Sequence, residues 1–453
     1  MTIMVRRSMR ILLLLGSWSL FSVPAFAQLD NVFSNLFYEI LGPGRLSLSP
    51  GKHANHFKPA ADNANAELVP ALNSLIVGDI SSFPLSSASG GISYDFSSGH
   101  PVRTTESLGP IFAETARPLG KGKLQVEANF TYLDLTRFRG LPSDQIDFTF
   151  THQLVPGDME LGDNPNESDI IDVVMDLHTR ISIGAVVASW GVTDDLDASI
   201  AIPVTSVHIN GTAVATIHSY TFAEGGAAHH FFGGDSLHPV LVANFPYDRS
   251  ATGLGDVALR VKYSLARGGS MDAAGLLDVR FPTGEKENFL GTGKPSYRLW
   301  GILSTQMGNG GVHLNAGYTR NPADLQSDAF EFRAGFDNKL SQKVTFALDA
   351  LGKIDLNKNE AAHLAPGTAT IIDRIENTRD NPGGGLVPDI SSVRVVKLSN
   401  IPDRNNDNAY SAAIGFRYAP SDDVVIFANV LVPLNDGGLR AQMAPTVGVS
   451  AAL

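Results

Sequence analysis

Residues 123–132, KLQVEANFTY, alternate strictly between polar and apolar side chains. The apolar positions hold Leu124, Val126, Ala128, Phe130 and Tyr132, and Lys, Gln, Glu, Asn and Thr stand between them. Because successive side chains of a β-strand point to opposite faces, this alternation predicts a strand with one apolar and one polar face.

The same alternation recurs along most of the chain. Further copies, some of them weaker, lie at 196–204, 257–265, 312–318, 330–337, 344–350 and 410–418. Counting such runs predicts an all-β fold of about 12 antiparallel strands, within a range of about 10 to 14. The range is this wide because residues 139–170 and 385–400 are ambiguous.

Two architectures fit such strands, a soluble β-sandwich and a transmembrane β-barrel. Three features favour the barrel. Several runs reach the ~9–11 residues that a tilted strand needs to cross a bilayer. Short connections alternate with long ones, as in outer-membrane barrels. Aromatic residues also stand near the ends of the apolar faces, where interfacial girdles occur, at Tyr132, Tyr263, Tyr318, Tyr410 and Tyr418.

The connections predict which rim faces which side of the membrane. Residues 193–195, 338–342 and 420–423 are rich in the Asp, Asn, Ser and Pro of tight turns, and we expect them to be periplasmic hairpins. We expect long extracellular loops near 219–252, 282–295 and 354–390.

The N-terminus predicts export. Arg6, Arg7 and Arg10 precede an apolar run, and Ala25-Phe26-Ala27 offers small residues at a cleavage site. The rival, an uncleaved anchor, is disfavoured because the run is interrupted by Gly16, Ser17 and Ser19 and is short for ~30 Å of hydrocarbon. We therefore expect a signal peptide at 1–27.

Residues 28–100 differ in composition from the strands that follow. They are rich in Ala, Asn, Ser, Gly and Pro, with two short helix-like patches at 32–41 and 67–76. We expect a segment of loops and short helices, serving either as a periplasmic leader or as a plug in the lumen. The predicted β-barrel then occupies 101–453.

Composition excludes some functions. Cysteine is absent, so no disulfide or thiol chemistry is expected. The net charge of −12 argues against a nucleic-acid partner, because phosphate binding needs a basic surface. The mean hydropathy of +0.02 suits a barrel but equally suits a soluble protein.

No catalytic or cofactor motif is complete. The glycines around Lys294 fail the phosphate-loop pattern because Asn288 stands where a glycine is needed. The nucleophile elbow and the zinc-protease motif are missing, so we expect no enzyme and no cofactor. His229, His230 and His238 lack metal-ligand spacing, and the calcium-like run from Asp403 to Asp407 lacks its glycine. We therefore expect no metal site.

Charged residues keep to the polar register of the predicted strands. A charge on the lipid face at mid-bilayer would cost about 2–4 kcal/mol, which supports placing this register inside. The candidates for selecting solutes in the lumen are Glu127, Asp197, Arg260, Lys262, Asp278, Arg280, Glu331, Arg333, Asp349 and Arg417. The same residues could equally serve as cross-strand pairs that stabilise the wall.

Several motifs, taken in order, resemble a family of outer-membrane transporters named for the meta-pathway of phenol degradation. They lie at 108–114, 119–124, 253–257, 281–293, 314–318 and 429–440. The resemblance implies a barrel and the uptake of small, aromatic or hydrophobic molecules, and it carries no catalytic motif. The chain departs from such barrels at its last residue, where Leu453 replaces the usual aromatic.

These observations predict an outer-membrane channel for passive diffusion of small solutes. Expected partners are outer-membrane lipids, lipopolysaccharide, the barrel assembly machinery and the solute. Two alternatives are a lipid-modifying barrel enzyme and a closed structural or adhesion barrel.

Overall fold

The computed structural model describes residues 28–42, 46–48, 56–84, 94–95, 102–103, 107–154, 161, 167–223, 225–322, 327–357, 367–380 and 386–453. The predicted signal peptide, 1–27, lies outside these residues.

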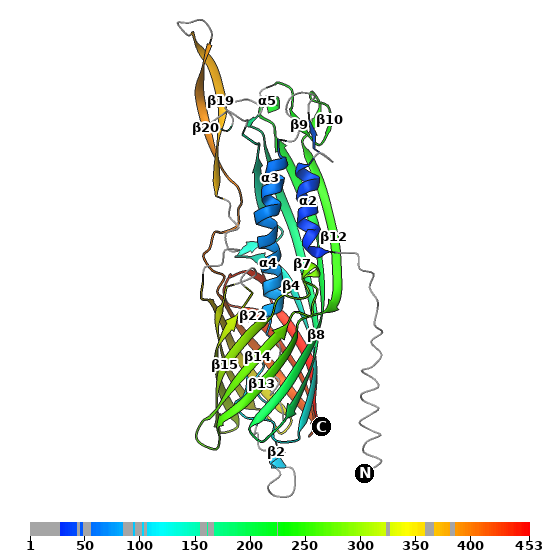
Figure 1. The fold of residues 1–453 in the computed structure, drawn as a ribbon, viewed down its shortest axis with the longest axis vertical. Coiled ribbons are helices and arrows are strands. Elements are labelled where there is room, and N and C mark those ends of the chain that lie inside the picture. Colours follow the sequence, from blue (N-terminus) through cyan, green and yellow to red (C-terminus); the bar gives the residue numbers. More distant parts are fainter. Residues whose placement is uncertain are drawn as a thin grey trace.

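Twelve antiparallel strands form a closed barrel (Figure 1). In chain order they are β4 (Leu124–Phe138), β7 (Ile170–Gly191), β8 (Leu196–His218), β13 (Val257–Ala266), β14 (Asp272–Phe281), β15 (Ser296–Met307), β16 (Gly310–Arg320), β17 (Ala329–Lys339), β18 (Val344–Asp355), β21 (Ala409–Ser421), β22 (Val424–Pro433) and β24 (Ala444–Ala452). Pairing of β24 with β4 closes the ring. The predicted fold class and strand number are confirmed.

One rim of the barrel carries short turns, as predicted. Residues 192–195 join β7 to β8, residues 340–343 join β17 to β18, and residues 422–423 join β21 to β22. Leu453 lies at the same rim, where its backbone N–H donates to the Leu124 carbonyl at 2.7 Å. We call this end the short-turn rim.

The outward register of the barrel is apolar and exposed. Large side chains in this belt keep about 40–60% of their surface, including Leu259 (44%), Leu277 (44%), Leu299 (62%) and Phe416 (53%). Exposing such a continuous apolar surface to water would cost free energy. In a membrane barrel it is the surface that is expected to face the lipid.

Two strands run far beyond the barrel and form an extension (Figure 1). The outer part of β7 pairs with β6 (Ile146–Thr151), and the outer part of β8 pairs with β12 (Val242–Leu254). The predicted loop at 219–252 therefore contains a strand, a correction that follows from this pairing. The predicted loop at 354–390 likewise contains β19 (Thr368–Asp380) and the start of β20 (Leu386–Lys397), which pair as a hairpin.

The faces of β7 exchange their chemistry where it leaves the barrel. In the barrel, Val186 and Trp190 point outward and are about half exposed, whereas Ser189 is buried. In the extension the outward positions include Asp176 and Arg180, and the buried ones are Ile171, Val173, Met175 and Leu177. β8 changes in the same way, from an outward Ile200, Ile202 and Val204 to a buried Val207, Ile209, Ala213 and Ala215. The exchange locates the passage from lipid to water on the outside of the wall.

The buried face of the extension is covered by N-terminal helices. These are η1 (Leu29–Asn31), α2 (Val32–Leu41), α3 (Lys58–Asn63), the π-helical turn η2 (Ala64–Leu68) and α4 (Val69–Ser82). Apolar residues in α2 recur at three- and four-residue spacing, so one face of the helix is apolar. On that face Phe33 contacts Tyr247 and Phe37 contacts Phe148, with ring centroids 6.5 and 5.9 Å apart.

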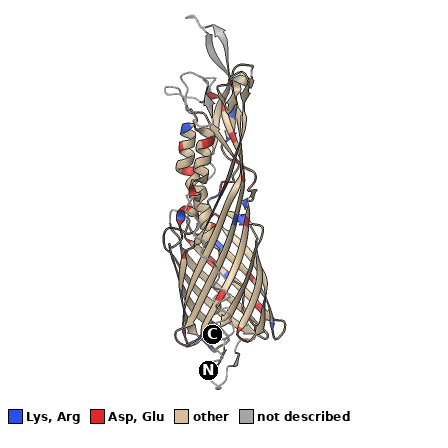
Figure 2. Cartoon of the chain, turned by 90° about the vertical axis from the view of Figure 1, so that its right-hand side faces the viewer, with Lys and Arg blue, Asp and Glu red and all other residues tan. Residues whose placement is uncertain are grey.

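Burial of each such aromatic side chain stabilises the packing of the helices on the strands by about 1.5–3 kcal/mol, which suffices to hold them there. The helices lie at the end opposite the short-turn rim, and Figure 2 marks positions of charged residues along them. No described helix is long and apolar enough to cross a membrane. The domain boundaries drawn from the sequence stay a prediction.

Short elements complete the described chain. They are β1 (Ser47–Leu48), β2 (Tyr94–Asp95), β3 (Val102–Arg103), β5 (Leu141–Pro142), α5 (Tyr220–Ala223), β9 (His230–Phe231), β10 (Gly233–Gly234), β11 (Pro239–Val240), η4 (Lys286–Asn288) and β23 (Leu439–Ala441). Of these, β23 pairs with the outer end of β4 and matters for the site described below.

The change of face predicts unequal effects of the same substitution. Leu277→Arg places a charge in the belt and should destabilise the barrel in bilayers by about 2–4 kcal/mol. Val174→Arg, on the outward face of the extension at 41% exposure, should change stability by less than about 0.5 kcal/mol. Urea unfolding in lipid vesicles measures both, and equal losses would show that the boundary is misplaced.

Candidate functional site

A segment with no regular secondary structure crosses the inside of the barrel. Residues 107–119, which we call the strap, lie directly before β4 and contact inward side chains of many wall strands. Residues 107–114 and 116 are all buried, as shown by Phe112 (1% exposed) and Glu114 (5% exposed). The lumen is thus filled at this level by the chain itself.

Asp349, on β18, is the main anchor of the strap. Its carboxylate accepts backbone N–H groups from Phe112 at 2.5 Å, Ala113 at 2.8 Å and Ile111 at 3.4 Å. Asp349 is 1% exposed, so these bonds replace its hydration. Hydrogen bonds to a charged acceptor contribute about 1.5–3 kcal/mol, which makes this carboxylate the strongest single attachment point.

Cationic wall residues hold the strap carbonyls. Arg333 donates to the Phe112 carbonyl at 2.7 Å, and Arg417 donates to the Pro110 carbonyl at 2.5 Å. Lys262 donates to the Arg117 carbonyl at 3.0 Å. The wall therefore supplies acceptors to the N–H groups of the strap and donors to its carbonyls.

Ion pairs fix the part of the strap nearest β4. Glu114 pairs with Arg260 at 2.7 Å, and Arg117 pairs with Asp272 at 2.7 Å. Asp197 accepts the N–H of Leu119 at 3.0 Å. All these partners are charged or polar, so water could replace each contact if the strap moved.

Small apolar contacts complete the fit. Ile111 and Phe112 cluster with Ala347 and Ala413 of the wall. A Cβ at Gly335 would lie 2.7 Å from the Cβ of Ala113, closer than real Cβ atoms approach. Glycine is therefore needed at 335 because the strap passes directly against β17.

The ten charged residues predicted for the lumen all lie inside the barrel, each at most 9% exposed. The structure brings six of them to the strap, namely Asp197, Arg260, Lys262, Arg333, Asp349 and Arg417. Their role in selecting solutes stays a prediction.

The other four make contacts with wall residues and with α4. Glu127 accepts from Asn129 at 3.1 Å, and Glu331 accepts from Thr319 at 2.5 Å. Asp278 lies between Arg260 at 3.4 Å and Arg280 at 3.9 Å. Arg280 also donates to the Ser81 carbonyl at the end of α4. These residues therefore combine cross-strand pairing with contacts to the N-terminal segment.

The strap itself was missed as a functional element. Residues 107–119 fell within the predicted barrel at 101–453 because they directly precede the clearest strand. Their lack of any two-residue alternation was the available signal. An irregular run that contains Gly109, Pro110 and Pro118 has no periodicity that would indicate which surface it contacts.

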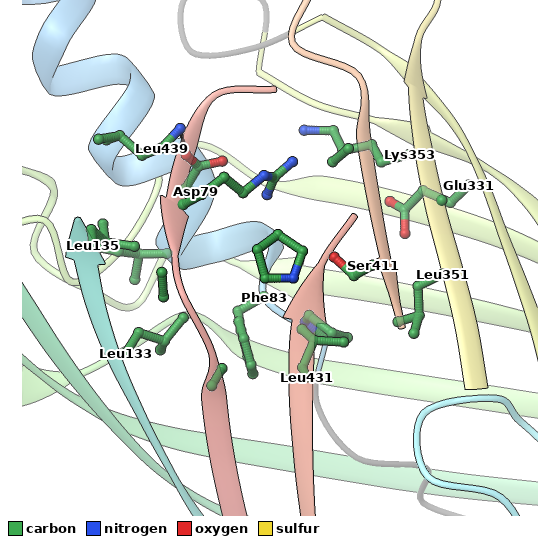
Figure 3. A pocket seen from close by; sticks show the side chains of 18 of the residues that line it. Asp79, Phe83, Leu133, Leu135, Glu331, Leu351, Lys353, Ser411, Leu431 and Leu439 are labelled. Carbon is green, nitrogen blue, oxygen red and sulfur yellow. Dashed lines mark hydrogen bonds between the residues drawn. The ribbon is translucent and has the colours of Figure 1, made fainter. Parts of the chain in front are cut away.

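A partly enclosed pocket lies between the end of α4 and the wall (Figure 3). Its volume is about 130 Å³. The apolar lining includes Ile80, Phe83, Leu133, Leu135, Ile181, Leu351, Leu431 and Leu439. The inward register of β4 changes from Gln, Glu, Asn and Thr to Leu133 and Leu135 here, so the lumen is polar near the short-turn rim and apolar towards the opposite mouth.

Charged residues occupy one side of this pocket. They are Asp79, Glu331, Arg333, Lys353 and Arg440. Figure 3 shows Asp79, Lys353 and Glu331 on one side and Phe83, Leu133 and Leu431 on the other. The pocket adjoins the strap, because Arg333 contacts both and the rings of Phe83 and Phe112 are 6.5 Å apart.

Asp79 ties α4 to the wall at this pocket. Its carboxylate accepts the backbone N–H of Leu439, in β23, at 2.9 Å. Burial raises the pKa of Asp79 to about 6, although Arg440 and Lys353 act in the opposite direction.

This raised pKa predicts how the docking of α4 depends on pH. Because the pKa is higher in the folded state than in an exposed Asp, the stabilisation is complete below about pH 4 and is lost as the pH rises through 6. This difference in pKa limits the contribution of Asp79 to the stability of the folded state to about 3 kcal/mol, and water in the pocket reduces that contribution. Hydrogen exchange of the α4 amides should therefore be slower at pH 5 than at pH 7 after correction for intrinsic rates.

Asp79→Asn supplies the control, because it keeps an acceptor for the Leu439 N–H but cannot ionise. Its exchange should show no such pH dependence. Wild-type α4 that becomes better protected between pH 5 and pH 7, relative to this variant, would contradict the prediction.

The histidine and aspartate residues that the sequence analysis rejected as metal ligands take part in structural contacts. His230 bonds Asp169 at 2.8 Å, and His238 lies with Asp235 on an exposed turn. Asp407 pairs with Arg139 at 2.8 Å. Within the described ranges, no group of three or more His, Asp or Glu residues could hold a metal ion.

No protein-family model and no curated protein sequence matches the chain. Solved structures with a similar fold are outer-membrane proteins. An outer-membrane channel from Pseudomonas putida F1 has a TM-score of 0.40 and 9% identity, covering 75% of this chain and 98% of that one. The NanC porin has a TM-score of 0.34 and 10% identity, covering 73% of this chain and 100% of that one. A FadL homologue from Pseudomonas aeruginosa has a TM-score of 0.32 and 11% identity, covering 81% of this chain and 98% of that one.

Proposed function

We propose that the protein is a gated channel of the bacterial outer membrane that admits small apolar or aromatic molecules. The observation that carries this proposal is the strap, residues 107–119, held in the lumen by reversible polar contacts. A twelve-stranded barrel is wider than the eight-stranded kind whose interior side chains fill, so a movable segment can open a path.

The chemistry of the strap supports gating over permanent closure. A structural barrel closes most stably with a continuous apolar core, because each buried charge must be desolvated. Here the attachment consists of charged side chains on the wall and backbone groups on the strap. Water can take over these bonds, so displacement of the strap exposes a polar, hydrated lumen.

The pocket at the end of α4 supports the solute class. Apolar side chains line most of it, and it lies at the mouth opposite the short-turn rim, next to the strap. A molecule that arrives from outside would leave water for this apolar surface before it meets the gate.

Location and partners are part of the same proposal. The apolar belt suits outer-membrane lipids, and the extension with its helices would stand on the external side among lipopolysaccharide. The signal peptide and the barrel assembly machinery would deliver the chain there.

Single-channel recording in planar bilayers tests the proposal. We expect discrete conductance steps from the purified, heat-modifiable protein. A folded protein that stays silent in repeated reconstitutions, and that also stays silent when the strap is released, would favour the closed structural barrel.

A further inference from the structure

We infer that the pocket between α4 and the wall binds small aromatic carboxylates, so that the solute is an anion and not merely an apolar molecule. This inference rests on the proposed function and names the substrate class of the same site. Three features of the pocket support it, namely its size, the charges on its wall and one buried donor.

The size fits a single ring. An apolar cavity of about 150 Å³ accommodates benzene, and this pocket has a volume of about 130 Å³ with one side incompletely enclosed. Phe83, Leu133 and Leu431 supply the apolar surface that an aromatic ring would cover (Figure 3). A fused or branched ligand would exceed this space.

The charges on the pocket wall favour an anion. Three cationic residues, Arg333, Lys353 and Arg440, line the pocket against two acidic ones, Asp79 and Glu331. Glu331 also accepts a hydrogen bond from Thr319, and Asp79 accepts one from the Leu439 N–H. The acidic groups thus have hydrogen-bond donors of their own, and the cations exceed them by one.

Arg440 offers a donor with no acceptor. Its Nε is buried and has no hydrogen-bond partner among the described residues. A buried N–H without an acceptor costs about 1–3 kcal/mol, so a ligand oxygen that accepts this bond would be favoured. A carboxylate suits a guanidinium because it can accept two parallel N–H bonds.

Binding would also act on the gate. Arg333 lines the pocket and donates to the Phe112 carbonyl of the strap. A carboxylate in the pocket competes for this guanidinium, because a charged acceptor is stronger than a carbonyl. The bound solute would therefore weaken one attachment of the strap that blocks its own path.

Calorimetric titration of the full-length protein in detergent tests the inference with three probes of similar size. These are benzoate, benzyl alcohol and benzylammonium, which share the ring and differ in charge. We expect benzoate to bind at least about tenfold more tightly than benzyl alcohol, the effect of one charge-assisted hydrogen bond. Equal binding of all three, or preference for benzylammonium, would overturn the inference.

Three variants assign the effect to the pocket. Arg440→Gln should weaken benzoate by about tenfold and change benzyl alcohol little. Arg249→Gln, an exposed arginine on β12, is the matched control and should change neither. Ala409→Leu fills the pocket and should weaken both probes without removing a charge.

The outcomes separate this inference from the proposed function. If benzoate fails to bind while release of the strap produces conductance, the channel stands and the substrate class is wrong. If benzoate binds as predicted but no strap variant conducts, the binding site stands and the channel is wrong.

Discussion

Asp349→Asn is expected to raise the open probability of the channel by about 10- to 100-fold. The substitution removes the charge that accepts three backbone N–H groups of the strap, and it places an amide donor against them. Hydrogen bonds to a charged group contribute about 1.5–3 kcal/mol, which corresponds to that range. Single-channel recording measures the open probability directly.

Asp337→Asn is the matched control for this variant. Asp337 is a fully buried carboxylate on β17, and it bonds His313 at 2.7 Å instead of the strap. It should leave the open probability near that of the wild type. An equal increase in both variants would mean that loss of any lumen charge, and not release of the strap, causes conduction.

A steric variant tests the same attachment without changing charge. Gly335→Ala puts a methyl group where the strap passes, 2.7 Å from the Cβ of Ala113. It should also raise conduction. Gly275→Ala, on β14 with nothing within 4 Å of the added methyl, should have no effect.

Asp407→Ala is expected to open locally the mouth opposite the short-turn rim. The Arg139 side chain is completely buried and bonds Asp407 through Nε at 2.9 Å and Nη2 at 2.8 Å. Removal of one partner from such a pair costs about 3–5 kcal/mol, because the other charge is left unpaired. Hydrogen exchange of the Gly438 amide, which donates to Asp407, should become more than about a hundredfold faster.

An exposed pair provides the comparison for Asp407. Asp195 and Arg267 form an ion pair in which both side chains are 44% exposed. Asp195→Ala should cost less than about 1 kcal/mol, as surface pairs do. A similarly small effect at Asp407 would show that the Arg139 site is hydrated, contrary to its burial.

The sequence predicted the barrel because its strands carry a strong local signal. The alternation at 124–132 became β4, and the turn residues at 193–195, 338–342 and 420–423 fell at the short-turn rim. The two-residue alternation and the turn residues both depend on near neighbours in the chain, so they can be recognised without knowledge of the tertiary structure.

The extension was missed for a physical reason. In β7 the two-residue period is unbroken, but the apolar set moves from odd positions at 171–177 to even positions at 186–190. A single outward apolar face cannot be assigned to a strand whose apolar side changes in this way, so the pattern at its outer end was ambiguous. It reflects a change of surroundings, from helices inside and water outside to lumen inside and lipid outside.

The site was predicted in part. The inward register of Asp349, Arg417 and the other charged residues followed from alternation, because the cost of a charge in lipid is large. What these residues bind could not be predicted, since the strap contacts strands more than 200 positions away and has no period of its own. The pocket likewise depends on the meeting of α4 with β23, a long-range contact.

A reversible lock on the strap shows whether its movement opens the channel. Cysteine is absent from the chain, so Ala113→Cys with Gly335→Cys introduces a single pair. The two Cβ positions are 2.7 Å apart, and a disulfide needs about 3.5–4.5 Å, so a shift of about 1 Å suffices. We expect that the oxidised protein does not conduct and that dithiothreitol restores conductance steps in the same bilayer. Equal conductance before and after reduction would contradict it.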